Sequence, residues 1–146
     1  LNVPPPPNLS LFPTIANMVE ELGCELALLK FQESEFFATL SKTYPETAKS
    51  LTRVFLNRSG EAIVATFRHI PAAVPFHSFE ELKGINVPTL ILGNRDDPIH
   101  PFEYAERLSA AIPGAQLREF PSKSDSLEEH QRQFRHHVRI FLNTIL

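Results

Sequence analysis

The stretch from Val87 to Pro101 (Val-Pro-Thr-Leu-Ile-Leu-Gly-Asn-Arg-Asp-Asp-Pro-Ile-His-Pro) constrains the fold more than any other part of the chain. Its apolar segment, residues 88–92, is bounded by proline and glycine, which predicts a short strand buried on both faces. Gly93 ends this strand, and Pro101 suits the first position of a helix, where its missing N–H needs no partner. Two carboxylates, residues 96–97, lie between them. The sequence therefore predicts a carboxylate at the carboxyl end of a strand, where open α/β sheets place their active sites.

The rest of the chain is predominantly helical in pattern. Apolar residues recur at helical spacing in five segments that proline, glycine or polar residues separate. These predicted helices cover residues 13–22, 25–32, 33–42, 45–58 and 61–70. Residues 4–7 are all proline, which predicts an extended polyproline segment ahead of them. After Pro101 the pattern predicts a helix to residue 112, a second strand over 115–120, and a closing helix whose start, Ser126 with Glu129, has the spacing of a capping box.

The turn after the first predicted strand resembles the segment of the α/β-hydrolase family that carries the acid of the catalytic triad. Many members have an apolar strand, a glycine, and then an Asp-Pro-aliphatic-x-Pro turn. The matching residues here are Gly93 and Asp97-Pro98-Ile99-His100-Pro101. The proline that follows Asp97 selects this residue as the acid, whereas counting from Gly93 selects Asp96. The resemblance extends from this turn to the C-terminus, because strand, acid turn, helix, strand and closing helix follow in the family's order.

This resemblance implies an α/β fold that is mostly helical. Residues 1–76 stand where the family commonly inserts a helical cap, or lid, after its sixth strand. Residues 77–146 then form the C-terminal strand–helix–strand–helix part of an α/β-hydrolase core. Five amphipathic helices without a strand form a layer that needs another layer to cover. An independent helical domain is the alternative for residues 1–76.

The predicted base departs from the family pattern. The family usually places its histidine in a Gly-His pair just after the last strand, but Ser124-Asp125 stand at that position here. The next histidine is His130, which lies in the first turn of the closing helix and on its apolar stripe. We therefore predict Asp97 and His130 as the catalytic acid and base. His100, beside the acid, is predicted to bind substrate and is the other candidate for the base.

The nucleophile is the second departure. A Ser-His-acid triad needs a serine, which this family carries on a Gly-x-Ser-x-Gly elbow. None of the five glycines frames such a serine. The chain also begins with Leu1 and a proline-rich stretch that is typical of a connector. We therefore expect the C-terminal fragment of a serine-type α/β hydrolase, inactive alone, whose full-length form cleaves ester, amide or C–C bonds in a small-molecule substrate.

Composition excludes several other classes of function. The net charge is −3 without a basic block, which argues against nucleic acid as a partner. No apolar run reaches the ~18 residues of a membrane span, and a single cysteine, Cys24, excludes an intrachain disulfide and is mildly cytosolic evidence. The pair His136–His137 has no acidic ligand four residues on, so we predict no metal site. No cofactor is expected, and the expected location is cytoplasmic.

Two further expectations concern partners. The apolar strand at residues 88–92 carries no charge to blunt an unpaired edge, so we expect a homo-oligomer. A competing hypothesis from another class is a non-enzymatic helical interaction or dimerisation module. Such a module would bind its partner through an exposed apolar face of residues 1–76.

Overall fold

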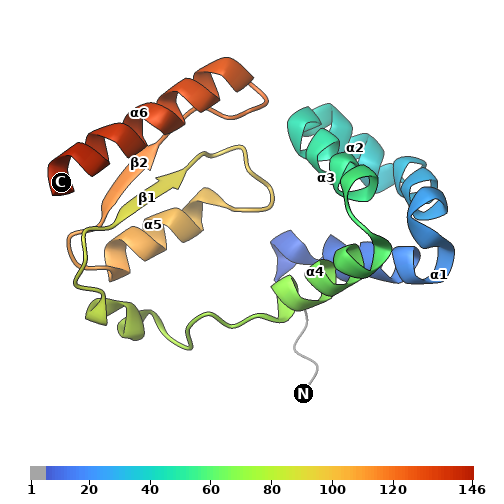
Figure 1. Cartoon of the computed structure of the whole chain (residues 1–146), viewed down its shortest axis with the longest axis horizontal. Coiled ribbons are helices and arrows are strands. Elements are labelled where there is room, and N and C mark those ends of the chain that lie inside the picture. The colour runs from blue at the N-terminus through green and yellow to red at the C-terminus, as the bar shows by residue number, and fades with distance from the viewer. Residues whose placement is uncertain (1–5) are drawn as a thin grey trace. The chain divides into compact units, whose positions relative to one another are not determined.

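The computed structural model describes residues 6–146 and divides into two compact units (Figure 1). Unit 1 ends at Ala73 and unit 2 spans Val74–Leu146. Of the polyproline segment predicted at residues 4–7, positions 4 and 5 lie outside the described residues, and Pro7 begins a short 3-10 helix, Pro7–Leu9. The fold is mixed α/β and mostly helical, with one parallel sheet of two strands in the described part of the chain.

Unit 1 is built from four helices, and its first helix changes direction at Gly23. This glycine has φ 76° and ψ 166°, a backbone conformation open to glycine but not to residues with a Cβ. The sequence pattern predicted a break at this position, and the break is confirmed. The helices are α1 (Leu11–Gln32), α2 (Glu35–Thr43), α3 (Pro45–Asn57) and α4 (Gly60–Ala72).

The starts of these helices follow from local residue chemistry. The hydroxyl of Ser34 accepts a hydrogen bond from the Phe37 N–H at 3.1 Å and caps α2. Ser59 caps α4 in the same way. Pro45 begins α3, where its fixed φ favours the helix and its missing N–H has no cost. The end of α4 differs from the prediction, because the helix continues through Pro71 to Ala72. A proline in the last turn removes a single backbone hydrogen bond, which a helix end tolerates.

Phenylalanine rings form the core of unit 1. Phe31 is only 2% exposed, and its ring lies 5.1 Å from that of Phe37 and 5.7 Å from that of Phe55. Phe12 and Phe67 stack at 4.4 Å and join α1 to α4. Each buried phenylalanine contributes about 1.5–3 kcal/mol through the apolar surface it removes from water. The aromatic contacts therefore hold four short helices in one cluster.

Unit 2 is a strand–helix–strand–helix arrangement. A 3-10 helix at Phe79–Gly84 leads into it, and its elements are β1 (Leu90–Gly93), α5 (Phe102–Ala111), β2 (Gln116–Glu119) and α6 (Leu127–Ile145). The strands pair in parallel, with Leu90 opposite Gln116 and Gly93 opposite Glu119. Figure 1 shows the sheet running between α5 and α6. Pro101 precedes α5 as its N-cap rather than starting it, which corrects the sequence prediction.

Strand β1 is less buried than its sequence predicted. All four of its residues are half-buried, although a fully apolar strand was expected to be covered on both faces. Among the described residues β1 pairs with β2 alone, and few apolar side chains of unit 2 are buried. The buried ones are Phe102, Ile112 and Phe120. Strand β1 is only half-buried because, among the described residues, no second strand pairs with its other edge and few side chains cover its faces.

No helix within residues 6–146 is both long enough and apolar enough to cross a lipid bilayer.

Candidate functional site

The candidate site lies at one edge of the sheet in unit 2. Because β1 and β2 are parallel, the loops that follow them leave the sheet at the same edge. The Phe120 N–H donates to the Gly93 carbonyl at 3.1 Å, which is the last backbone hydrogen bond between the strands. Just beyond it, Arg95 Nε donates to Glu119 Oε1 at 3.1 Å. The loop that carries Asp97 is thereby fastened to the end of β2.

Asp97 organises the turn between β1 and α5. Its Oδ1 accepts hydrogen bonds from the N–H groups of Ile99 at 2.9 Å and His100 at 3.0 Å. This is an Asx turn, in which a side chain replaces a backbone acceptor. The second oxygen, Oδ2, lies 3.1 Å from Nδ1 of His100. A carboxylate can only accept, so Nδ1 carries a proton, and in the neutral imidazole Nε2 holds the lone pair. Asp96 makes no comparable contact and is exposed, so the geometry distinguishes the two carboxylates.

The contact changes the pKa of both partners. Partial burial of Asp97 acts to raise the pKa of its carboxyl, but hydrogen bonds from the His100 side chain and backbone outweigh it and lower this pKa below 3.8. The hydrogen bond to Asp97 raises the pKa of His100 above 6.5, although partial burial and the positive charge of Lys123 oppose it. Asp97 is therefore ionised at neutral pH, and His100 gains protons more readily than an ordinary histidine.

His130 lies at the start of α6, after the loop that leaves β2. It is 8% exposed, and its ring packs 4.8 Å from that of Phe120. Its Nδ1 lies 2.8 Å from the carbonyl oxygen of Pro121, so Nδ1 is the protonated nitrogen. Within residues 6–146, the His130 imidazole makes its hydrogen bond to Pro121 and not to Asp97. The Asp97 carboxylate is hydrogen-bonded to Ile99 and His100. The structure brings Asp97 and His100 into contact and leaves His130 attached to its own loop.

The loop between β2 and α6 is fixed by Ser122. This residue is buried, its Oγ accepts from the Ser124 N–H at 3.2 Å, and its carbonyl accepts from the N–H groups of Asp125 and Ser126. Lys123 follows directly, and its charge acts on the pKa of His100. The loops after the two strands therefore lie near each other. No sequence motif pointed to Ser122 or Lys123 as site residues.

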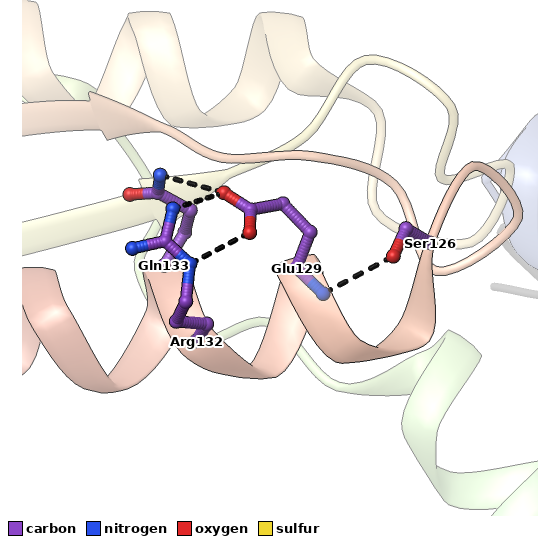
Figure 2. Close-up of polar contacts among 4 residues, drawn as sticks. All are labelled: Ser126, Glu129, Arg132 and Gln133. Carbon is purple, nitrogen blue, oxygen red and sulfur yellow. Dashed lines mark hydrogen bonds and ion pairs between the residues drawn. The ribbon is translucent and has the colours of Figure 1, made fainter.

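The first turn of α6 positions the backbone of His130. Ser126 Oγ accepts from the Glu129 N–H at 3.2 Å, as Figure 2 shows. The predicted capping box is only half formed, because the Glu129 carboxylate turns to Arg132 Nε at 2.7 Å and Gln133 Nε2 at 2.8 Å. The hydrogen bonds from Arg132 and then Gln133 lower the pKa of Glu129 to about 2. Glu129 thus forms hydrogen bonds with side chains of the next helical turn and does not cap the N-terminus of α6.

Unit 1 contains an open cavity of its own, about 660 Å³ in volume, between α1 and α4. Arg68 on its wall forms an ion pair with Glu20 and donates to Asn17 Oδ1 at 3.2 Å. Arg68, Glu20 and Asn17 thus satisfy one another, and Glu61 and His69 also line the cavity. Across residues 6–146 no group of three or more histidine, cysteine, aspartate or glutamate side chains is arranged to hold a metal ion.

The fold and site together define a class: a mixed α/β chain with a parallel strand–helix–strand unit and an Asp–His pair at the carboxyl edge of its sheet. Comparison with known proteins adds no narrower assignment, since no family model and no curated protein matches the chain.

Proposed function

We propose that this chain supplies the acid and base side of a serine-type α/β-hydrolase site. The observation that carries the proposal is the parallel pairing of β1 and β2. This pairing places Asp97 after one strand and the loop to His130 after its neighbour, at the same edge of the sheet. Active sites in open α/β sheets form at this edge. Asp97, with its lowered pKa and its imidazole partner, matches the role of the acid in a catalytic triad.

The proposed division of labour follows from what the chain contains. Asp97 orients an imidazole, which takes a proton from the nucleophile and stabilises the charge it gains. The imidazoles at this edge are His130 and His100. The serine nucleophile and the oxyanion hole come from protein outside these 146 residues, because the chain holds no Gly-x-Ser-x-Gly elbow. The chain alone is then inactive towards ester, amide or C–C bonds of a small-molecule substrate.

The packing of unit 2 supports the proposal that its core continues elsewhere. The outward edge of β1 is apolar and uncharged (Leu-Ile-Leu-Gly), whereas β2 carries Arg118 and Glu119 and suits the outside of a sheet. Along the apolar stripe of α6, the exposed side chains are Leu127, Phe134, Leu142 and Ile145. These features, a charged edge strand, an apolar edge strand and a helix with exposed apolar side chains, are those expected of the last two strands of a larger sheet. Unit 1 then corresponds to the helical cap.

The test is made on the native protein that carries this chain. A fluorophosphonate probe, which reacts with activated serines, should label a serine outside residues 1–146. Labelling should be lost in Asp97→Asn and retained in Asp96→Asn, because only Asp97 contacts an imidazole. A native protein that resists the probe, or equal labelling of the two variants, contradicts the proposal.

A second candidate function is a non-enzymatic interaction module, and one observation favours it. Leu26 and Leu29 lie three residues apart on α1, after its break at Gly23, and both are exposed; Leu22, just before the break, is exposed as well. An exposed apolar patch is a common protein-binding surface. The two functions predict different results for Leu26→Ser: it abolishes partner binding in a module and leaves serine labelling intact in a hydrolase.

A further inference from the structure

We propose that His100, rather than His130, is the general base that Asp97 orients, and that His130 is a positioning residue for the loop after β2. This inference deepens the proposed function and rests on it. The sequence pattern assigns the two roles differently: it predicts His130 as the base and His100 as a substrate-binding residue. The two histidines differ in what each imidazole nitrogen contacts.

The turn holds His100 with one nitrogen on the acid and the other open. Nδ1 lies 3.1 Å from Asp97 Oδ2, and the backbone N–H of the same residue is bonded to Asp97 Oδ1. Pro98 and Pro101 restrict the backbone on either side of this contact. The His100 side chain is 81% exposed, so Nε2 is accessible to a group that this chain does not contain. A general base needs this arrangement: Nδ1–H on a carboxylate and Nε2 free for the incoming proton.

His130 lacks both features. Its Nδ1–H is bonded to the Pro121 carbonyl at 2.8 Å, so that nitrogen is not available to a carboxylate. Its ring is buried against Phe120, whereas the His100 side chain is 81% exposed. The acceptor at Nδ1 of His130 is a neutral carbonyl, which is a weaker hydrogen-bond partner than an ionised carboxylate. The contacts of His130 instead tie the first turn of α6 to the end of β2.

The charges around His100 are those that tune a base. Asp97 is bonded to it within the same turn, and the positive charge of Lys123, in the loop after β2, acts on its pKa. The carboxylate stabilises the imidazolium, while the ammonium of Lys123 limits how far its pKa rises. The resulting pKa lies above 6.5, and efficient general bases have a pKa near the operating pH.

The proposed step is a balanced proton transfer. The O–H bond of a serine from outside this chain breaks, its proton moves to Nε2 of His100, and the serine oxygen forms a bond to the electrophilic carbon or phosphorus. Nδ1–H stays on Asp97 throughout. When the bond from that carbon or phosphorus to the leaving group breaks, the leaving group keeps the electron pair and takes the proton from Nε2, which returns His100 to its neutral state.

The same substitution at both histidines provides a matched test. An asparagine side chain keeps an N–H donor close to the position of Nδ1 but cannot act as a base. His130→Asn should retain the bond to Pro121 and lose far less of the fluorophosphonate labelling rate than His100→Asn does. His100→Asn should lose about 100-fold or more, the usual contribution of a general base. The measurement is the labelling rate of the native protein.

A second readout distinguishes catalysis from structure. In the 146-residue chain, NMR titration of the imidazole signals should give His100 a pKa that falls in Asp97→Asn. In the native protein the acid limb of the labelling rate should move with the His100 pKa. Loss of labelling in His130→Asn but not His100→Asn overturns the inference and leaves the hydrolase proposal standing. A His100 pKa indifferent to Asp97→Asn also overturns it. A wild-type protein that does not label overturns both.

Discussion

Gly93 is the position where a single methyl group should disturb unit 2 most selectively. A Cβ built at Gly93 meets Phe102 Cδ2 at 3.0 Å, Ala105 Cβ at 3.1 Å and Phe102 Cε2 at 3.2 Å. These atoms belong to α5, and Phe102 is one of the few buried side chains of unit 2. In Gly93→Ala, α5 must therefore move away from β1. Overpacking of this kind costs about 1–3 kcal/mol, partly offset by about 0.4–1 kcal/mol from the stiffer unfolded chain.

Amide hydrogen exchange measures this loss where it occurs. The N–H groups of Gln116 and Phe120 bond to Thr89 and Gly93 across the sheet at 2.9 and 3.1 Å. A destabilisation of about 1–2 kcal/mol speeds their exchange by roughly 5–30-fold, because 1.36 kcal/mol is a factor of ten. The control is Gly84→Ala, whose Cβ has no atom within 4 Å, and which should change exchange by about twofold or less. Equal exchange in the two variants would refute the proposed packing of α5 on β1.

The remaining predictions concern stability, pH and association. Phe31→Ala should destabilise unit 1 by about 3–5 kcal/mol in urea denaturation, because it empties a site surrounded by phenylalanine rings; a loss below about 1 kcal/mol would contradict that core. Ser59→Ala should remove the cap of α4 and lower stability by about 0.5–2 kcal/mol. The Asp97–His100 pair should stabilise the fold most between pH 3.8 and 6.5, since its contribution is lost as pH falls through the lowered pKa of Asp97 and as pH rises through the raised pKa of His100. In Asp97→Asn the thermal midpoint should lose this pH dependence, and an unchanged profile would argue against the contact. The 146-residue chain should self-associate through its uncovered apolar surfaces in sedimentation experiments at micromolar concentration, and a monomer with a cooperative melt would count against both the homo-oligomer and the incomplete core.

The acid turn illustrates how far residue patterns reach into the candidate site. Proline after Asp97 singled out this carboxylate, and the structure shows it accepting three hydrogen bonds, one from Ile99 and two from His100. Those contacts are local, so they depend on turn chemistry that the sequence carries. The partner of the acid was harder to predict, because His100 and His130 are both compatible with the pattern. The choice depends on where Pro121, in the loop after β2, directs its carbonyl group.

The sequence by itself determined the helices of unit 1, the break at Gly23 and the order of elements in unit 2, because proline, glycine and apolar periodicity act over a few residues. Only the tertiary structure decided that β1 and β2 pair in parallel, that β1 is half-covered, and that Glu129 binds Arg132 instead of closing a capping box. These features arise from contacts between residues far apart in the chain or from competition among nearby partners. Short-range patterns do not encode the geometry that settles such contacts.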